Sequence, residues 1–192
     1  MAERSGNFRA QVRRSPRKLA KLGALSHRVA SNSDQFERDL NTLFTLHEKR
    51  WGKQTPFMQA AAFHREFARQ AFTRGWSRLW ILEIDDRPIA AELGFRFAGS
   101  EFFYQSGRDP SFRDVSLGFM VLVHAIREAV AEGIHEFRLL RGGEPYKLRL
   151  ATADPGVETY GFSRGSAARF LLASALAARG RSLGFRHILD RL

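Results

Sequence analysis

The sequence predicts an α/β fold with a mixed sheet, in which antiparallel strands come first, a parallel strand–helix–strand unit follows, and helices flank the sheet. Two observations predict this class. Alternating hydrophobic residues indicate two strands joined by a turn at 85–88, and a third strand follows directly. The stretch 101–140 then reads as strand, helix and strand, and strands joined by a helix lie parallel with a right-handed crossover.

The composition predicts one folded core with charged ends. The chain has 192 residues, 44% of them hydrophobic, and no cysteine, which excludes disulfides, thiolate metal sites and a cysteine nucleophile. No stretch reads as a signal peptide or a membrane span, so we expect a cytoplasmic location. Of the net charge of +11, residues 1–30 carry +7, residues 163–192 carry +5 and the stretch between them −1. We therefore expect a basic helical segment at 1–24, a central domain at 25–165 and a basic amphipathic helix at 166–192.

The part of the chain before the hairpin is expected to form helices and one strand. Residues 8–22 favour a basic helix, which Pro16 must start or interrupt. Residues 25–30 read as a strand, and a long helix that ends at Gly52 follows. A second helix, from about 59 to 73, has an aromatic face that its spacing assigns to the core: Phe63, Phe67 and Phe72.

The second half continues in the order that the fold class requires. Strands are expected at 78–84, 89–97 and 101–107. Ser116 can cap a helix whose apolar residues recur at helical spacing until Gly133 ends it. The elements expected beyond this helix are a parallel strand at 134–140, a last strand at 157–163, and helices at 167–179 and 183–192.

The start of the helix after Ser116 is a candidate phosphate site. Leu117, Gly118 and Phe119 supply unpaired backbone N–H groups at the positive end of the helix dipole, and Gly118 has no side chain to keep a phosphate away. The alternative is an ordinary helix packed on its sheet, because most such units bind nothing at that end. Residues 141–147 form a charged turn at the carboxyl edge of the sheet, where open α/β sheets bind ligands.

Three stretches carry a resemblance to a known family: FYQSGRDPSF, SLGFMVLVHAIREAVAEGI and FRLLRGGEPYK. They resemble the acetyltransferase domain of the CelD-like proteins of cellulose biosynthesis, which are relatives of the FemAB peptidyltransferases and have the GNAT N-acetyltransferase fold. The resemblance is specific over 101–147 and looser from about 25 to 165. Members commonly carry a further amino-terminal half.

The resemblance implies a bacterial acyltransferase that uses acetyl-CoA as donor and no metal. The amine of a small molecule or glycan would attack the thioester directly, with a link to polysaccharide or cell-envelope biosynthesis. Glu92 is the candidate base, with an ordinary exposed glutamate as the alternative, and Tyr146 is the candidate acid for the thiolate, with a core tyrosine as the alternative. The implied cofactor contacts are Arg113, Ser116, Leu117, Gly118, Phe119 and Leu140, and the implied acceptor contacts are Tyr104, Arg108, Arg141, Glu144 and Lys147.

Two other functions stay open at this point, and the sequence predicts no oligomeric state. FemAB relatives use aminoacyl-tRNA as donor, and the basic segment 8–22 is where a nucleic acid would bind. A half-length chain can also be a non-catalytic binding module. Acetyl-CoA binding discriminates among the three. Because every assigned residue lies within the neutral stretch 31–162, we expect the basic ends to be separable from the chemistry. His64 and His124 receive no role.

Overall fold

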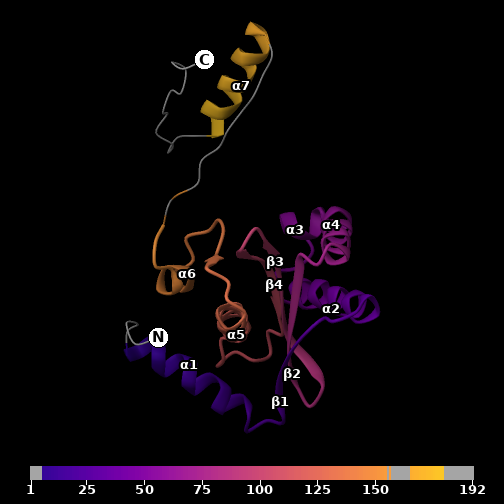
Figure 1. Ribbon diagram of the computed structural model, residues 1–192, viewed down its shortest axis with the longest axis vertical. Helices are drawn as coiled ribbons and strands as arrows, with labels where there is room; N and C mark the ends of the chain where they lie inside the picture. Colours follow the sequence, from indigo (N-terminus) through magenta and orange to yellow (C-terminus); the bar gives the residue numbers. More distant parts are fainter. Residues whose placement is uncertain (1–5, 155, 157–164, 180–192) are drawn as a thin grey trace. The chain divides into compact units, whose positions relative to one another are not determined.

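The computed structural model describes residues 6–154, 156 and 165–179, and it confirms the predicted α/β class (Figure 1). The chain divides into two units, Met1–Thr152 and Ala153–Leu192. The first unit includes the basic amino-terminal helix, which the composition had set apart. The second contains helix α7 (Ser166–Arg179), while the strand expected at 157–163 and the helix at 183–192 lie outside the described residues. No helix in the described ranges combines the length and apolar character of a bilayer span.

The first unit is built on a sheet of five strands in the order β1-β2-β3-β4-β5. The first four strands pair antiparallel, and β5 pairs parallel to β4, as the sequence predicts. The hairpin turns at Asp85–Asp86 and Ala98–Gly99 have positive φ at both residues, which matches the twist of the strands they connect. The strands are β1 (Leu25–Val29), β2 (Ser77–Ile84), β3 (Arg87–Phe97), β4 (Ser100–Arg108) and β5 (Glu136–Arg138).

Strand β5 is shorter than the predicted 134–140. Its pairing with β4 ends at Arg138, and Leu140 has a φ of 54°, in the left-handed region that a strand does not use. The chain therefore turns away from the sheet where the sequence pattern still reads as strand.

Helices α2 (Ser33–Trp51), α3 (Pro56–Gln59) and α4 (Ala61–Thr73) cover one face of the sheet (Figure 1). The core on this side packs α2 against the middle of β2 and β3. The prediction that the aromatic face of α4 is core is wrong for two residues: Phe63 is 62% exposed and Phe67 41% exposed. Ala68 and Ala71 are the buried residues of α4, because small side chains let the helix approach the sheet closely, and only Phe72 of the aromatic set packs on the core.

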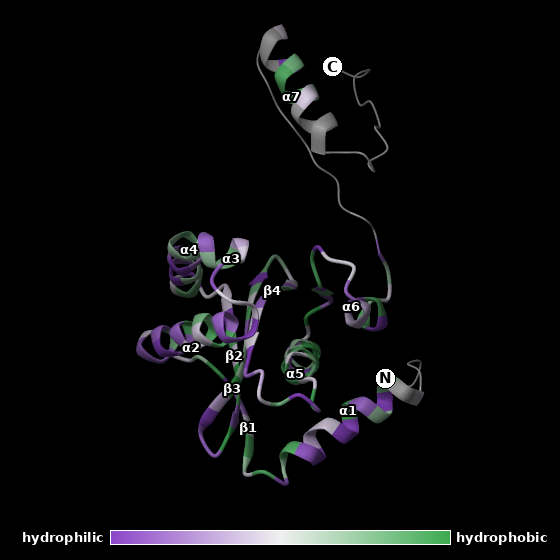
Figure 2. Ribbon diagram, turned by 180° about the vertical axis from the view of Figure 1, so that it is seen from behind, coloured by the Kyte–Doolittle hydropathy of each residue, from purple (hydrophilic) through white to green (hydrophobic). Residues whose placement is uncertain are grey.

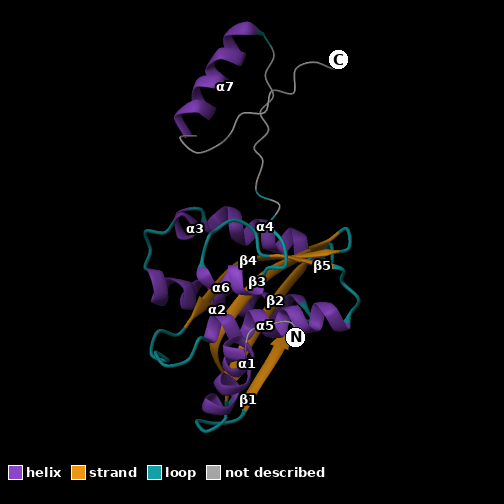
Figure 3. Cartoon of the chain, turned by 90° about the vertical axis from the view of Figure 1, so that its left-hand side faces the viewer, coloured by secondary structure: helices purple, strands orange, loops and turns teal. Residues whose placement is uncertain are grey.

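Helix α5 (Leu117–Ala131) covers the opposite face, together with α1 (Gly6–Leu19) and α6 (Pro145–Leu150) (Figure 3). Its apolar residues form the hydrophobic helix seen in green in Figure 2, and Leu117, Val121, Leu122 and Ala125 are fully buried. The site described below lies around the two ends of the β4–α5–β5 crossover.

Helix α1 runs through Pro16, although the sequence was expected to start or break the helix there. Proline lacks only its own N–H, so one helical bond, to the carbonyl of Val12, is missing, while the carbonyl of Pro16 accepts from Ala20 N–H at 2.9 Å. One face of α1 is buried at Phe8, Val12 and Leu19. The Phe8 ring meets the Phe119 ring of α5 edge-on, with the two ring centroids 5.4 Å apart. The basic segment is therefore an integral part of the core and not an appended arm.

Candidate active site

Strands β4 and β5 pair only briefly and then separate. Their parallel pairing covers Ser100–Phe102 on β4, and β4 continues to Arg108 without this partner. A strand without its neighbour presents backbone N–H and C=O groups along one side. An extended ligand can pair with such groups as an added strand would.

Tyr104 is a bulged residue on the separated part of β4. The β3 residues Leu93 and Gly94 pair with the positions on either side of it, which leaves Tyr104 without a cross-strand partner. A bulge bends a strand and re-aims the side chain. The Tyr104 hydroxyl lies 2.8 Å from Nδ1 of His64 on α4. Burial lowers the pKa of His64, which favours the neutral imidazole.

The first turn of α5 presents two free donors where the sequence predicted three. The Leu117 N–H is hydrogen-bonded to the carbonyl of Val115 at 3.0 Å, whereas the helix uses neither the Gly118 nor the Phe119 N–H in this described segment. A methyl group placed on Gly118 would meet no atom within 4 Å. Close packing therefore does not require the glycine, and the space beside it is open.

Ser116 occupies the N-cap position of α5, but its side chain does not cap the helix. Its hydroxyl instead accepts a hydrogen bond from Nε2 of Gln11 at 3.3 Å. The side-chain amide oxygen of Gln11 accepts a hydrogen bond from the guanidinium of Arg149 on α6 at 2.9 Å. Helix α1 is thus connected by one side chain to the start of α5 and to α6.

A polar cavity of about 260 Å³ lies between α1 and the segment that leads into α5. Two of its residues, Arg14 and Lys18, are exposed cations, and Asp114 is an anion. Cations beside a helix amino terminus favour the binding of a phosphate group. Arg113, the expected side-chain contact, does not line the cavity. The residues that do are Ala10, Gln11, Arg14, Ser15, Lys18, Asp114 and Ser116.

Glu92 lies in the middle of β3 on the α5 side of the sheet, because it pairs with Trp80, which packs on α5. The side chain is 1% exposed, and its Oε2 and the indole Nε1 of Trp80 have no hydrogen-bond partner in the described structure. Burial, and secondarily the charge of Glu101, raises the pKa of Glu92 well above its usual range. Glu92 is therefore not the exposed strand glutamate of the alternative interpretation.

Tyr146 lies on the side of the sheet that α5 covers, as Glu92 does. The residue belongs to α6 and packs against the cluster of Phe8, Val12 and Phe119 between α1 and α5. Burial, with smaller contributions from Glu144 and Glu92, raises the pKa of Tyr146 to about 12. The phenol consequently keeps its proton at neutral pH. The structure thus brings the two candidate catalytic residues into one region, on the side of the sheet that α5 covers.

The expected acceptor contacts do not form one cluster. Lys147 is 6% exposed, donates a hydrogen bond to the carbonyl of Arg141 and pairs with Glu144 at 3.2 Å, so these three residues close their own turn. Lys147 is not available to a ligand in this arrangement, because its charge is satisfied within the turn. Arg108 stands at the far end of β4, and Tyr104 faces α4 instead.

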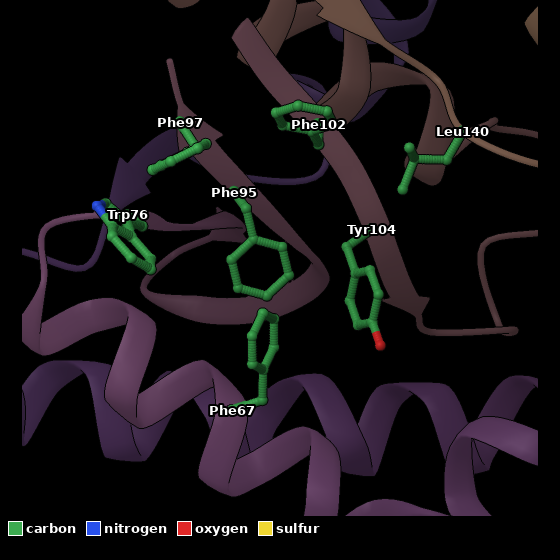
Figure 4. A pocket seen from close by; sticks show the side chains of 7 residues that line it. All are labelled: Phe67, Trp76, Phe95, Phe97, Phe102, Tyr104 and Leu140. Atoms are coloured by element: carbon green, nitrogen blue, oxygen red, sulfur yellow. The ribbon is translucent and has the colours of Figure 1, made fainter. Parts of the chain in front are cut away.

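A second cavity, the aromatic cavity, lies on the α4 face where β4 and β5 separate (Figure 4). Its volume is about 360 Å³, and Leu140, which was expected to contact the cofactor, forms one of its walls. Figure 4 shows Phe67 pointing from α4 towards Phe95, while the Tyr104 oxygen points away from the cavity centre. The lining residues are Phe67, Trp76, Phe95, Phe97, Phe102, Tyr104 and Leu140.

Sequence reasoning missed the contributions of α1 and α4 to these cavities. The spacing of Phe8, Val12 and Leu19 was a signal that α1 has a buried face, which turns Arg14 and Lys18 towards the start of α5. No signal placed His64 beside Tyr104, because forty residues and two strands separate them along the chain.

Comparisons with known proteins agree with this fold. Residues 6–148 match the family described as the acetyltransferase (GNAT) domain. A search of curated proteins found no match. Among solved structures, one described as a predicted acetyltransferase with acetyl-CoA from Clostridium acetobutylicum is similar with a TM-score of 0.54 and 15% identity, covering 71% of this chain and 96% of that one. Another, described as a possible acetyltransferase from Clostridium difficile 630, has a TM-score of 0.52 and 14% identity, covering 73% of this chain and 99% of that one.

At these identities the solved structures show a shared fold, and the family match carries the assignment. That match covers residues 6–148, which include every residue that lines the two cavities and both candidate catalytic residues. The chain therefore belongs to the acetyltransferase (GNAT) domain family and is an N-acetyltransferase.

Proposed function

We propose that this enzyme transfers an acyl group, normally acetyl, from acyl-CoA to an amine, and that the donor's phosphates bind at the start of α5. Two observations support the donor site: the polar cavity, which Ser116 lines, and the Gly118 and Phe119 N–H groups, which follow Ser116 in the chain and are not used by the helix. Arg14 and Lys18 would add two charge-assisted contacts, which are stronger than neutral hydrogen bonds. Ser116 would contribute its hydroxyl, and Arg113 a longer-range positive charge.

The acyl end of the donor would lie in the gap between β4 and β5. The amide groups of the donor can pair with the backbone of β4 beyond Phe102, where β5 no longer pairs with this strand. The two cavities lie on opposite faces of the sheet, so donor and acceptor would approach the gap from opposite sides. Direct attack then requires only that the two reactants be held in line.

The reaction forms a C–N bond and breaks the C–S bond of the thioester. The leaving thiolate would accept a hydrogen bond from Tyr146, whose raised pKa keeps the phenol protonated. An acceptor ammonium must lose one proton to become nucleophilic and a second as the amide forms, and the thiolate takes up one of the two through Tyr146. Glu92, which is buried, would accept the other proton through water, and it could do so only in its ionised form, which its raised pKa disfavours at neutral pH. The neutral His64, acting through the Tyr104 hydroxyl, is the second candidate on the acceptor side.

We further propose membership in the CelD-like, FemAB-related branch of the family, with a link to polysaccharide or cell-envelope biosynthesis. The support for this branch is the resemblance of residues 101–147. Arg108, Arg141 and Glu144 remain proposed contacts at the rim of the gap, whereas Lys147 would act by holding the turn that carries the other two.

The test is a calorimetric titration of the purified protein with acetyl-CoA, CoA and an aminoacyl-tRNA. We expect acetyl-CoA to bind, and a variant with Arg14→Gln and Lys18→Gln to bind it at least tenfold more weakly, since each charge-assisted contact contributes about 1.5–3 kcal/mol. The matched control carries Arg13→Gln and Arg17→Gln, two exposed cations of the same helix outside the cavity.

Each other outcome of this titration decides against part of the proposal. Equal weakening by both double variants would show a general charge effect and would remove the donor site from α1. Binding of aminoacyl-tRNA without acetyl-CoA would assign the FemAB-type donor. A folded protein that binds neither donor would favour a non-catalytic module.

A further inference from the structure

The aromatic cavity is an apolar hollow at a place where the fold gives no structural reason for one. Its volume of about 360 Å³ lies in the range of small-ligand pockets. Several of its rings are far from buried, including Phe67 at 41% and Trp76 at 38% exposure. Large rings left this exposed on a monomer usually mark a binding surface.

The rings are arranged to receive a flat apolar group. Phe67 and Phe95 lie 4.9 Å apart at 60°, and the Trp76 and Phe97 rings meet edge-on at 5.1 Å. Aromatic rings prefer such edge and offset contacts, so a further ring can join them. The hydroxyl of Tyr104 is already bonded to His64 and points away from the centre of the cavity in Figure 4.

This wall argues against a sugar as the group that enters. A glycan would bring several hydroxyl groups against carbon, and each buried hydroxyl without a partner is unfavourable. An aromatic side group needs no hydrogen bond from the wall. The apolar lining therefore favours an acceptor with an aromatic group over a polyhydroxylated amine.

The rim of the cavity carries positive charge. The Arg74 guanidinium lies 5.5 Å from the Trp76 ring centroid, and Arg74 has no ion-pair partner in the described part of the chain. Arg138 lies 5.5 Å from the Phe102 centroid and is paired with Glu136 at 2.8 Å, so its charge is already balanced. Arg74, which also donates to the carbonyl of Gln70 at 3.2 Å, is thus an unbalanced positive charge at the Trp76 end of the cavity.

The aromatic cavity reaches the gap between β4 and β5, where the acyl transfer is proposed to take place. Phe102 is the last β4 residue that pairs with β5, Tyr104 is the bulge just beyond, and Leu140 follows β5. A molecule seated among these three residues lies at the opening where the acyl group would be presented. This position favours a reacting small molecule over a protein partner or a second copy of the chain.

Resting on the proposed function, we propose that the aromatic cavity binds the acceptor, and that the acceptor is an amine bearing an aromatic group. The aromatic group would occupy the space between Phe67, Trp76 and Leu140. The amine would face the gap between β4 and β5, at the end of the cavity away from Arg74.

The first experiment measures acetyl transfer by thiol release with four acceptors: L-tryptophan, L-phenylalanine, tryptamine and glucosamine. We expect kcat/KM for the three aromatic amines to exceed that for glucosamine at least tenfold. Arg74→Gln should leave the ratio between L-tryptophan and tryptamine unchanged, because a carboxylate on the carbon that carries the amine does not reach Arg74 when the amine faces the gap. A preference for glucosamine would overturn the assignment.

The second experiment uses variants of exposed rings, which leave the core intact. Phe67→Ala and Trp76→Ala should each raise the acceptor KM about tenfold and leave the acetyl-CoA KM unchanged. Phe63→Ala is the matched control, because Phe63 lies on the same helix, is 62% exposed and does not line the cavity. Equal effects of Phe63→Ala and Phe67→Ala would overturn the proposal.

A binding measurement separates this inference from the proposed function. N-acetyl-L-tryptophan, the expected product, is titrated calorimetrically into the unchanged protein and into Phe67→Ala, with a loss of affinity of about tenfold expected. Acetyl-CoA binding without any product binding would refute the aromatic acceptor and leave the donor site standing. Product binding without acetyl-CoA binding would support the cavity and refute the proposed donor. A dimer that Phe67→Ala dissociates would assign the surface to self-association instead.

Discussion

Removal of residues 1–22 should unfold the first unit of the enzyme. Helix α1 buries Phe8 at 4%, Val12 at 8% and Leu19 at 0% exposure. Burying one such side chain contributes about 1.5–3 kcal/mol, so the three together contribute on the order of 5–9 kcal/mol. A domain of ordinary stability has about 5–15 kcal/mol in total. The burial of α1 therefore predicts, against the expectation that the basic ends are separable from the chemistry, that α1 is needed for folding before any role in ligand binding is considered.

The assay is urea unfolding followed by circular dichroism. The shortened chain should show no cooperative transition, or a midpoint far below that of the full chain. Phe8→Ala in the full chain should lower the free energy of unfolding by about 3 kcal/mol. Arg13→Gln with Arg17→Gln should leave it unchanged, because both side chains are exposed. A shortened chain that unfolds at the same urea concentration as the full chain would show that the burial of α1 stabilises nothing.

Three further predictions concern single residues. Gly118→Val should weaken CoA binding at least tenfold without loss of stability, since the added side chain meets open space. Gly6→Val, in the first turn of α1, is the control and should leave the affinity unchanged. Calorimetric titration beside a urea melt measures both effects, and normal CoA affinity in Gly118→Val would remove the phosphate site from α5. Glu92→Gln should stabilise the protein at pH 8 but not at pH 4. The pKa of Glu92 is raised in the folded state, so the folded protein with Glu92 becomes less stable as the pH rises above the pKa that this carboxyl has in the unfolded chain. An equal difference in unfolding free energy between the variant and the unchanged protein at both pH values would contradict this prediction. Burial, and secondarily the charges of His124 and Arg127, lowers the pKa of His27 to about 4, so the unfolded chain binds the extra proton. Stability should therefore fall by on the order of 2 kcal/mol, after solvent screening, as pH drops from 6.5 to 4, and a His27→Gln variant should show a flatter unfolding profile over that range.

The order of the elements followed from local patterns. The β2–β3 hairpin was predictable because its apolar residues alternate and its turn residues tolerate positive φ, and α5 because its apolar residues recur at helical spacing up to Gly133. Both signals depend only on neighbouring residues. The bulge at Tyr104 has no such signal, because it depends on the register with β3.

The candidate site was less predictable because its residues act through tertiary contacts. The sequence located the start of α5 but could not show that Val115 accepts from Leu117, which removes one of three donors. The sequence placed Lys147 in the correct turn but could not show that its charge is paired with Glu144 and hydrogen-bonded to Arg141 within that turn. The exposure of Phe67 depends on how α4 is rotated against the sheet, and hydrophobic spacing alone assigns any such ring to the core.

The contacts of Gln11 have a consequence for the synthesis of the chain. This residue of α1 bonds Ser116, which lies 105 positions later, and Arg149, which lies 138 positions later. Contacts of such long range form only after the intervening chain exists, and they slow folding. During translation, domains generally begin to fold from the amino terminus. Here α1 must wait during translation, with its apolar face uncovered, until α5 and α6 have been synthesised to receive it.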